Sequence, residues 1–285
     1  MIRSEYPNGL VVMITGANSG LGYQTAVELA TLGVTLVITC RSIEKCNETK
    51  IKIIEITGNQ SIYALDLELG DPLSIKSFPE KYESLNVQVD VLLNNAGISM
   101  IFNHTLSSNQ EELNMDINCL STLSFTKIFL PYLKKSSHPR LLFTTSLSIK
   151  DYTLPSLSEE AWNTNKEHYH WYKAYAKSKF WLTAYAIELS KKETSFPILL
   201  IDPGTVATNI ARQSSLSNIF QSCLGKTLFP AKREIDNSVY CILNPSLSLS
   251  TCTIYHHKHI KPFPKAIRND KCTSFIYDTI ETKLN

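Results

Sequence analysis

A glycine-rich turn directly after the first apolar run constrains the fold of this chain more than any other feature. The run is Leu10-Val11-Val12-Met13-Ile14, and the turn is Thr15-Gly16-Ala17-Asn18-Ser19-Gly20-Leu21-Gly22. A continuous apolar run is typical of a strand buried on both faces of a parallel sheet. Where such a strand turns sharply into a helix, unpaired N–H groups and the helix dipole favour a phosphate, and glycine permits its close approach.

The glycines follow the spacing G-x-x-x-G-x-G, which differs from the G-x-G-x-x-G of many dinucleotide-binding folds. An ordinary turn between a strand and a helix is therefore an alternative interpretation. The position of the turn, after a buried strand and before a helix from about residue 20 to 32, favours a nucleotide-binding loop.

Apolar runs and amphipathic stretches alternate along the rest of the chain. Further strands are expected at 34–39, 62–65, 89–93, 141–145 and 198–201, and helices at 43–56, from Pro72 onward, within 113–133 and at 172–191. The alternation predicts an α/β fold with a single doubly wound parallel sheet of the Rossmann type and helices on both faces. We expect one domain over residues 1–285. Towards the C-terminus, the pattern predicts a mildly amphipathic segment at 214–229, a helix at 235–243 and a last strand at 251–255.

Composition excludes several classes of function. The net charge of +2 is too small to predict nucleic-acid binding, and Lys and Arg are scattered along the chain. The sequence has no run of about eighteen apolar residues, so no transmembrane helix is predicted. The segment ahead of the first strand is too short for a signal peptide. The seven cysteines form no Cys-x-x-Cys pair, so we expect a reduced, cytoplasmic protein, with contact to a membrane surface or lipid as an open alternative. His256, His257 and His259 have no neighbouring cysteine or carboxylate in the sequence, and no metal site is predicted.

Arg41 directly follows the second predicted strand. In doubly wound dinucleotide-binding sheets, an acidic side chain at this strand end accepts hydrogen bonds from the adenosine ribose, whereas an arginine can neutralise a 2′-phosphate. Cys40 stands where the acid would be expected. This favours NADP(H) over NAD(H), although an exposed arginine that begins a helix is the alternative.

Two tyrosine–lysine pairs lie at or near the start of the helix predicted at 172–191. Tyr175 and Lys179 are one helical turn apart, and so are Tyr169 and Lys173. Six residues separate the two tyrosines, so on a helix they would point in different directions. Only one pair can face a bound cofactor.

Four ordered signatures resemble the short-chain dehydrogenase/reductase family. They are the turn from Thr15 to Gly22, Asn94-Asn95-Ala96-Gly97, Ala174-Tyr175-Ala176-Lys177-Ser178-Lys179, and Asp202-Pro203-Gly204-Thr205-Val206-Ala207-Thr208. The resemblance covers roughly residues 8 to 210 and selects Tyr175 and Lys179 as the catalytic pair. Cys40-Arg41 and the run from Arg140 to Ser146 look most like the retinol dehydrogenase branch and its WW-domain-containing oxidoreductase relatives. The chain departs from the usual pattern of that branch at two places, Asn118-Cys119-Leu120-Ser121 and Thr145-Ser146. Both departures keep the side chains that the resemblance implies are catalytic, Asn118 and Ser146.

The resemblance implies a role for each catalytic residue. Tyr175 would be the acid in carbonyl reduction or the base in alcohol oxidation, and the nearby Lys179 ammonium would favour its phenolate. Lys179 would also hold the nicotinamide ribose. Ser146 would hydrogen-bond the substrate oxygen, where negative charge develops, and Asn118 would support a proton relay through water.

The resemblance also implies a set of cofactor-binding residues. In addition to Tyr175 and Lys179, these are Gly16, Asn18, Ser19, Gly20, Leu21, Gly22, Arg41, Asp66, Asn94, Ala96, Gly97, Pro203, Gly204, Val206 and Thr208. Asp66 matches a family position near the adenine amino group, and the alternative is a helix-capping aspartate.

The segment between Ser146 and Tyr175 is long for a connection in a compact domain. Residues 147–170 hold several aromatic side chains, which could form an apolar lid above the nicotinamide or a surface loop that packs its rings on the body. Residues 208–232 are expected on the substrate side as well. Trp181 is expected to be a packing residue.

These observations predict an NADP(H)-dependent oxidoreductase that interconverts a carbonyl and an alcohol on a hydrophobic retinoid, steroid or lipid aldehyde. Homo-oligomers are frequent in the family, and the sequence leaves the oligomeric state of this chain open. The competing hypothesis is a catalytically silent nucleotide-sensing protein of the same fold. A nucleotide-dependent methyltransferase shares the opening turn but has no use for the tyrosine, lysine and serine.

Overall fold

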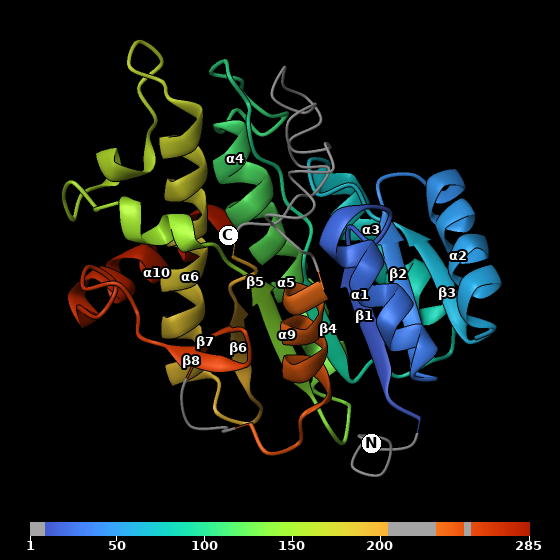
Figure 1. Ribbon diagram of the computed structural model, residues 1–285. Coiled ribbons are helices and arrows are strands. Elements are labelled where there is room, and N and C mark those ends of the chain that lie inside the picture. The colour runs from blue at the N-terminus through green and yellow to red at the C-terminus, as the bar shows by residue number, and fades with distance from the viewer. Residues whose placement is uncertain (1–8, 205–231, 248–251) are drawn as a thin grey trace.

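The computed structural model describes residues 9–204, 232–247 and 252–285, and within them the chain forms one eight-stranded sheet (Figure 1). The strands are β1 (Val11–Thr15), β2 (Thr35–Cys40), β3 (Ile62–Asp66), β4 (Val91–Asn94), β5 (Arg140–Thr144), β6 (Ile198–Ile201), β7 (Thr253–His256) and β8 (His259–Lys261). Their order is β3-β2-β1-β4-β5-β6-β7-β8, and all neighbours run parallel except β7 and β8. The predicted Rossmann-type fold is confirmed.

Helices cover both faces of the sheet. They are α1 (Gly20–Thr31), α2 (Ile43–Thr57), α3 (Pro72–Glu83), α4 (Leu113–Met115), α5 (Thr122–Leu133), α6 (Trp171–Lys192), α9 (Lys232–Leu243) and α10 (Asp270–Leu284). One apolar core joins the sheet to α3, α5, α6 and α10, and a second core joins it to α1, α2 and α9. Within β1, Met13 belongs to the first core and Val12 and Ile14 to the second, because successive strand residues face opposite sides.

Local chemistry sets the ends of the helices. Asp71 caps α3 by accepting a hydrogen bond from Leu73 N (2.9 Å), and Pro72 occupies the first turn as expected. Helix α2 ends at Gly58, whose φ of +73° lies in the left-handed region.

The C-terminal region adds two elements that we did not predict. Strand β8 returns antiparallel from β7 through His257 and Lys258, both with positive φ, as a two-residue hairpin turn requires. Helix α10 then packs against α6. The predicted helix at 235–243 and strand at 251–255 correspond to α9 and β7, whereas the predicted segment at 214–229 lies outside the described residues.

The expected helical stretch at 113–133 is continuous but changes its winding in the middle. A π-helical turn at Asp116–Ser121 separates α4 from α5. Thr122 Oγ1 donates to Ile117 O (2.8 Å), and Ser121 Oγ donates to the buried Asp116 carboxylate (2.6 Å). Single π-helical turns inside α-helices are frequent at functional sites, and this one carries Asn118.

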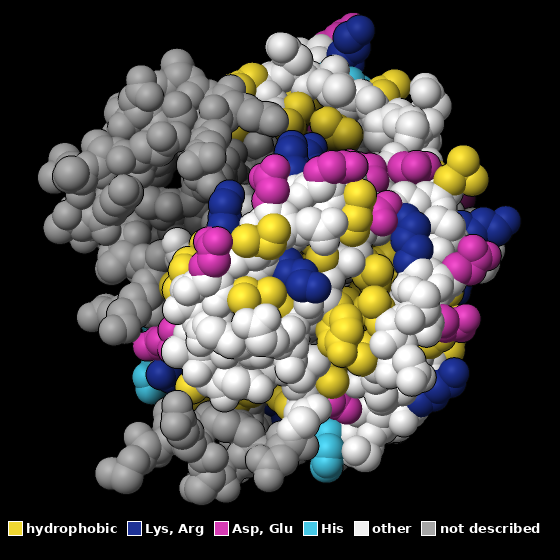
Figure 2. All heavy atoms as spheres, turned by 90° about the vertical axis from the view of Figure 1, so that its right-hand side faces the viewer, with side chains coloured by type: hydrophobic (Ala, Val, Ile, Leu, Met, Phe, Trp, Pro, Cys, Tyr) yellow, Lys and Arg dark blue, Asp and Glu magenta, His cyan; other side chains and the backbone are white. Residues whose placement is uncertain are grey.

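The face of the molecule that carries β3 is mixed in charge over its described residues. Figure 2 shows the face that carries β3, with acidic and basic side chains interspersed and small apolar areas between them. No helix in the described part of the chain is both long and apolar enough to cross a membrane.

Between α3 and α5, an aromatic cluster fills the core. Phe129 is fully buried, and its ring centroid lies 4.9 Å from that of Tyr82, 5.6 Å from that of Tyr132 and 5.8 Å from that of Phe125. Phe78 meets Phe125 edge to face at 5.0 Å. Such contacts add to the free energy of burial, so this cluster should hold α3 and α5 on the sheet.

We expect Phe129→Ala to lower the free energy of unfolding by about 3–5 kcal/mol, because the buried cluster cannot collapse fully around the cavity. Phe102→Ala is the matched control, since Phe102 is 47% exposed and should cost under about 1 kcal/mol. Urea unfolding followed by circular dichroism measures both. Equal losses for the two variants would contradict the importance of this cluster.

Candidate functional site

The turn between β1 and α1 requires glycine at three positions. Gly16 and Gly20 have φ values of +67° and +58°, in the left-handed region. A Cβ on Gly22 would lie 2.4 Å from Asn95 Nδ2 and 2.7 Å from Gly16 O. Ser19 precedes the helix and makes no side-chain capping hydrogen bond, and the first turn of α1 holds no acidic side chain. The positive end of α1 is therefore suited to an anion.

The side chains of one threonine and one asparagine join the carboxyl ends of β1 and β4 through hydrogen bonds. Thr15 Oγ1 accepts from the backbone N–H groups of Asn95 and Ala96, both at 3.0 Å. Asn95 Nδ2 donates to Thr15 O at 2.9 Å and lies 3.4 Å from Gly16 O. Asn95 therefore fixes the glycine turn, although it was absent from the predicted site residues. Its place in the Asn94-Asn95-Ala96-Gly97 string was the available signal.

The other predicted residues at this edge differ in where they point. Asn18 is exposed on the turn, and Leu21 is buried. Asn94 is buried, and its Nδ2 donates to Thr126 Oγ1 (3.0 Å) on α5. The side chain of Asn94 therefore braces the sheet against α5 rather than facing the glycine turn.

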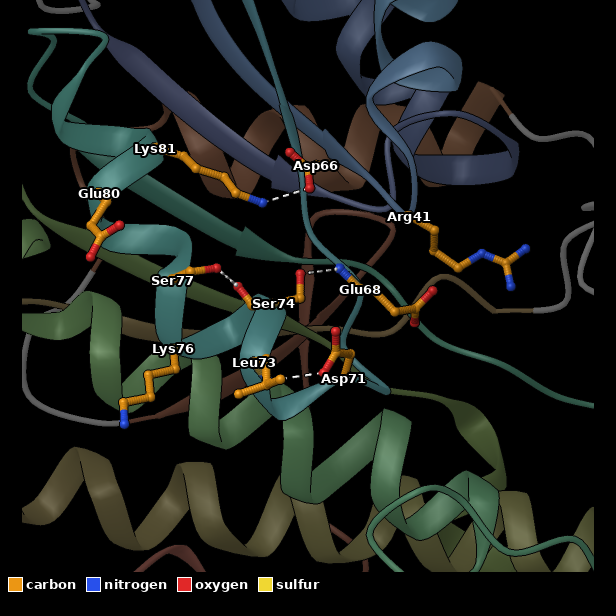
Figure 3. Close-up of a pocket in the computed structure, with 10 residues that line it drawn as sticks. All are labelled: Arg41, Asp66, Glu68, Asp71, Leu73, Ser74, Lys76, Ser77, Glu80 and Lys81. Atoms are coloured by element: carbon orange, nitrogen blue, oxygen red, sulfur yellow. Dashed lines mark hydrogen bonds and ion pairs between the residues drawn. The ribbon is translucent and has the colours of Figure 1, made fainter.

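Arg41 and Asp66 line a hollow at the carboxyl ends of β2 and β3. The hollow has a volume of about 720 Å³ and continues along α3 past Glu68, Asp71, Leu73, Ser74, Lys76, Ser77, Glu80 and Lys81. In Figure 3 the Arg41 side chain extends away from the α3 residues, and Asp66 lies between it and Lys81. Arg41 is exposed, so its guanidinium is accessible to a ligand. The buried Cys40 offers no acid at this strand end.

Asp66 forms an ion pair with Lys81, with 2.5 Å between Oδ2 and Nζ. Both side chains are about a third exposed, at 36% and 33%. Asp66 does not cap α3, because Asp71 does, so the alternative role of a helix-capping aspartate is wrong. In the sheet register Asp66 is paired with Cys40, at the strand ends beside Arg41.

Tyr175, Ser146 and Lys179 come together at the carboxyl end of β5. Tyr175 and Lys179 lie on α6, and the Ser146 hydroxyl lies close enough to the Tyr175 phenol to lower its pKa. Lys179 is 4% exposed, and its Nζ donates to Thr144 O (2.8 Å). Ser146 also accepts hydrogen bonds from Ser148 N and Ser148 Oγ at 3.2 and 3.0 Å, which hold its hydroxyl in place.

Asn118 joins this group from the π-helical turn. Its Oδ1 accepts from Ile98 N (2.7 Å), and its Nδ2 donates to Ile98 O (2.9 Å) and Ser178 Oγ (3.0 Å). A Cβ on Gly97 would lie 2.9 Å from Asn118 Oδ1 and 3.4 Å from Lys179 Nζ. Gly97 therefore leaves the space through which Asn118 and Lys179 approach the carboxyl end of β4.

Burial governs the acidity of the tyrosine and the lysine. Burial raises the pKa of the Tyr175 phenol, the nearby Ser146 hydroxyl lowers it, and the negative charge of Asp202 raises it further. Burial also lowers the pKa of Lys179 to about 8. The expected phenolate depends on a bound nicotinamide as well as on Lys179, and it stays a prediction. In the protein alone, burial is the largest cause of the raised Tyr175 pKa because an ionised phenol is costly in a low-dielectric site.

The second tyrosine–lysine pair lies elsewhere. Tyr169 precedes α6, and its hydroxyl donates to Ile101 O (2.8 Å) and lies 3.2 Å from Glu112 Oε1. Burial and the neighbouring Glu112 raise its pKa. Lys173 is exposed on α6. The structure thus brings only the pair formed by Tyr175 and Lys179 to Ser146.

Residues 147–170 are anchored by their aromatic rings and by a buried lysine. Trp162 packs on Trp181 with 5.1 Å between ring centroids, and Tyr152 packs on Phe180 at 5.0 Å. Lys177, 6% exposed, donates to Trp162 O (2.6 Å) and two further oxygens. These rings face the body of the protein, which favours the packed surface loop for this part of the segment. Trp181 is fully buried, as expected of a packing residue.

Pro203 and Gly204 follow β6 at the same edge of the sheet. Gly204 has a φ of +65°, and its N–H donates to Asp202 Oδ1 (2.9 Å). Val206, Thr208 and the predicted substrate-side segment 208–232 lie outside the described residues, except for the start of α9.

Comparison with known proteins agrees with this arrangement. The family model described as short chain dehydrogenase matches residues 10–155, and the chain belongs to that family. Retinol dehydrogenase 11 of Homo sapiens is 26% identical over 281 residues, which are 95% of this chain and 84% of that protein. Retinol dehydrogenase 13 of Homo sapiens is 31% identical over 210 residues, which are 73% of this chain and 62% of that protein. The expected resemblance to the retinol dehydrogenase branch is confirmed.

Solved structures share the fold. An uncharacterised protein from Mycobacterium paratuberculosis has a TM-score of 0.74 at 21% identity, over 100% of this chain and 97% of that chain. An alcohol dehydrogenase from the archaeon Thermococcus sibiricus, solved with 5-hydroxy-NADP, has a TM-score of 0.66 at 21% identity, over 90% and 100% of the two chains. A short-chain dehydrogenase from Escherichia coli CFT073, solved with NADPH, has a TM-score of 0.64 at 23% identity, over 85% and 94%.

Thr15→Val tests the link between β1 and β4. We expect it to lower the free energy of unfolding by about 2 kcal/mol or more relative to Thr15→Ser, because two N–H groups lose their acceptor. Thr15→Ser keeps the hydroxyl and loses only a methyl group. Urea unfolding of both variants gives the comparison, and identical midpoints would show that the hydroxyl does not hold these strand ends together.

Proposed function

We propose that this protein is an NADP(H)-dependent oxidoreductase that interconverts a carbonyl and an alcohol on a hydrophobic substrate. The single observation that carries the proposal is that the Ser146 hydroxyl lies close enough to the Tyr175 phenol to lower its pKa, with the buried Lys179 one turn along the same helix as Tyr175. A phenol and a hydroxyl that meet can both hydrogen-bond one substrate oxygen. Such a pair suits proton transfer at the oxygen of a carbonyl or an alcohol.

The edge of the sheet fits a dinucleotide. The glycine turn provides a backbone cradle with no room for a side chain at Gly22, and the topological switch between β1 and β4 is where doubly wound sheets bind such ligands. Gly16, Ser19 and Gly20 would face the pyrophosphate, and Ala96, Gly97, Pro203 and Gly204 would approach the nicotinamide half. When bound, the nicotinamide would supply or accept the hydride. Lys179 would hold the adjoining ribose hydroxyls.

The protein's own side chains would handle the proton. In reduction, Tyr175 would donate its phenolic proton to the oxygen as negative charge develops there, and Ser146 would donate a hydrogen bond to the same oxygen. Asn118, fixed by both backbone groups of Ile98, would position a water for return of the proton. In oxidation the proton would travel in the reverse direction.

Arg41 supports NADP(H) as the preferred dinucleotide. It is an exposed cation at the carboxyl end of β2, next to Cys40, where an acid would repel a 2′-phosphate. Two similar folds were solved with NADPH or an NADP derivative. The related retinol dehydrogenases, by their names, act on an apolar alcohol, which supports a retinoid, steroid or lipid aldehyde as substrate.

A catalytically silent nucleotide-binding protein is the competing function. The raised pKa of Tyr175 is the observation in its favour, because a phenol that stays protonated cannot act as a base. A protonated phenol remains a competent acid, however, so the same observation is compatible with carbonyl reduction.

Tyr175→Phe should lower turnover by about 10²–10⁴-fold, because the phenolic proton is lost, while dinucleotide binding stays within a few-fold of wild type. Tyr169→Phe is the matched control and should keep its turnover. NADPH absorbance with a panel of apolar aldehydes and ketones measures both. If wild type binds NADPH but reduces no member of the panel, the silent protein is the correct function.

Arg41→Met should weaken NADPH binding by about tenfold or more through loss of a charge-assisted contact, and should leave NADH binding unchanged. Lys76→Met removes another exposed cation from the same hollow and should change the affinity for neither NADPH nor NADH. Titration calorimetry measures the affinity of each of the two variants for NADPH and for NADH, and each value is compared with that of wild type. A loss of NADH affinity equal to that of NADPH would contradict a 2′-phosphate contact.

A further inference from the structure

Two aromatic side chains, Phe102 and Trp171, contact each other at the surface of the protein. The centroids of their rings lie 5.7 Å apart, with 56° between the ring planes. Phe102 is 47% exposed and Trp171 is half-buried, whereas the other two tryptophans of the chain, Trp162 and Trp181, are 3% and 0% exposed. Aromatic surface that stays in contact with water is unfavourable, so a ligand that covers this aromatic pair is stabilised.

Phe102 lies on a segment that is anchored in the proposed active site. Asn118 Oδ1 accepts from Ile98 N (2.7 Å), and Asn118 Nδ2 donates to Ile98 O (2.9 Å). Phe102 comes four residues after this anchor, and the same segment leads into α4, which packs against α6 (Figure 1). The chain after β4 therefore brings Phe102 from the proposed catalytic residues to the first residue of α6, Trp171.

The Trp171 ring is held in place by its neighbours at the start of α6. His170 Nδ1 accepts from Tyr172 N (3.2 Å) and so caps the helix. The His170 ring stacks on Trp171 with 6.1 Å between centroids, and the Tyr172 ring meets Trp171 edge to face at 5.6 Å. The Tyr172 hydroxyl donates in turn to Asp151 Oδ2 (2.5 Å). A ring that is already fixed loses little conformational freedom when a ligand packs on it.

Trp171 and Tyr175 lie on the same side of α6, one turn apart. Residues four positions apart on an α-helix point in similar directions and are separated by about 5.4 Å along the axis. Helical side chains lean towards the N-terminus, so Tyr175 leans towards the turn that begins with Trp171. The other side of α6 packs on the preceding loop, because Lys177 donates to Trp162 O and Trp181 packs on the Trp162 ring. A substrate whose oxygen lies at Tyr175 can therefore reach the aromatic pair with a group about one helical turn away.

We propose that the aromatic pair of Phe102 and Trp171 is a substrate subsite that binds a planar apolar ring or conjugated chain about one helical turn from the reacting carbonyl. The inference rests on the proposed oxidoreductase function and deepens it, because it names residues that select the apolar part of the substrate. Planar rings gain favourable stacked or edge-to-face contacts on aromatic side chains. A small carbonyl compound that ends before Trp171 gains nothing from the pair.

Butanone and benzylacetone test this subsite, because benzylacetone is butanone with a phenyl ring at its far end. Phe102→Ala and Trp171→Ala should each lower kcat/KM for benzylacetone by about tenfold or more, mainly through KM, since the phenyl ring loses its contact. Both variants should leave kcat/KM for butanone unchanged. Trp171→Phe keeps an aromatic ring and should retain most of the preference for benzylacetone. Ile56→Ala is the matched control, because Ile56 is 63% exposed on α2, and it should affect neither ketone.

NADPH absorbance measures turnover of both ketones by each variant. A loss for benzylacetone alone supports the subsite. An equal loss for the two ketones would show that the rings only support the fold, and no loss for either would place the aromatic pair outside the path of the substrate, so both results overturn the proposal. If Trp171→Ala fails to fold, Phe102→Ala decides the question.

A binding measurement separates the subsite from turnover. In the full chain labelled with ¹⁵N-tryptophan, the three tryptophans give three indole N–H signals by NMR, and Trp171→Phe identifies that of Trp171. Benzylacetone, added without and then with NADP⁺, should shift the Trp171 signal in at least one of the two states and leave the signals of Trp162 and Trp181 in place. No Trp171 shift in either state overturns the proposal. A Trp171 shift without turnover of any carbonyl would reject the proposed function and leave the subsite standing.

Discussion

The joining of β1 to β4 is the constraint on which the rest of the site depends. These strands are neighbours in the sheet although they are far apart in the chain, since the paired residues Ile14 and Leu93 are 93 − 14 = 79 positions apart. The Thr15 hydroxyl and the Asn95 amide close their carboxyl ends with four hydrogen bonds of 2.9 to 3.4 Å. Because Asn95 also fills the space beside Gly22, the same contacts shape the glycine turn.

A second set of contacts places the proposed catalytic residues on α6, and the burial of two lysines is their physical cost. Lys179 and Lys177 are both buried on α6, and burial lowers the pKa of each to about 8. Neither forms an ion pair within the described residues. Each instead donates to carbonyl oxygens, of Thr144 for Lys179 and of Trp162 and Asn163 for Lys177. One helix therefore fixes both the active-site edge and the neighbouring loop.

Much of this arrangement could be predicted from the sequence, because it depends on local patterns. The apolar run before Gly16 and the helix-starting Pro72 indicated their elements directly, and the Tyr175 signature located α6. The direction of the Asn94 side chain could not be predicted, since it depends on Thr126, which is 32 positions away. The raised pKa of Tyr175 in the protein alone could not be predicted either, because burial is a property of the fold. Strand β8 is only three residues long and lacks an apolar run. Helix α10 did have signals that were missed, because Asn269 caps it and its buried residues Cys272, Ile276 and Ile280 follow helical spacing.

The C-terminal region contributes to the site through charge rather than through catalytic groups. Lys261 on β8 lies beside Asp202, and Lys283 on α10 pairs with Glu111 (2.7 Å) while lying 4.7 Å from the centre of the Trp162 ring. Glu111 in turn accepts a hydrogen bond from Trp162 Nε1 (2.5 Å). The buried Trp162 ring contacts a cation and also donates to a hydrogen-bond acceptor, so it is held more firmly than a ring that makes only apolar contacts. The last elements of the chain therefore stabilise two of the segments that surround Tyr175, the turn after β6 and the loop before α6.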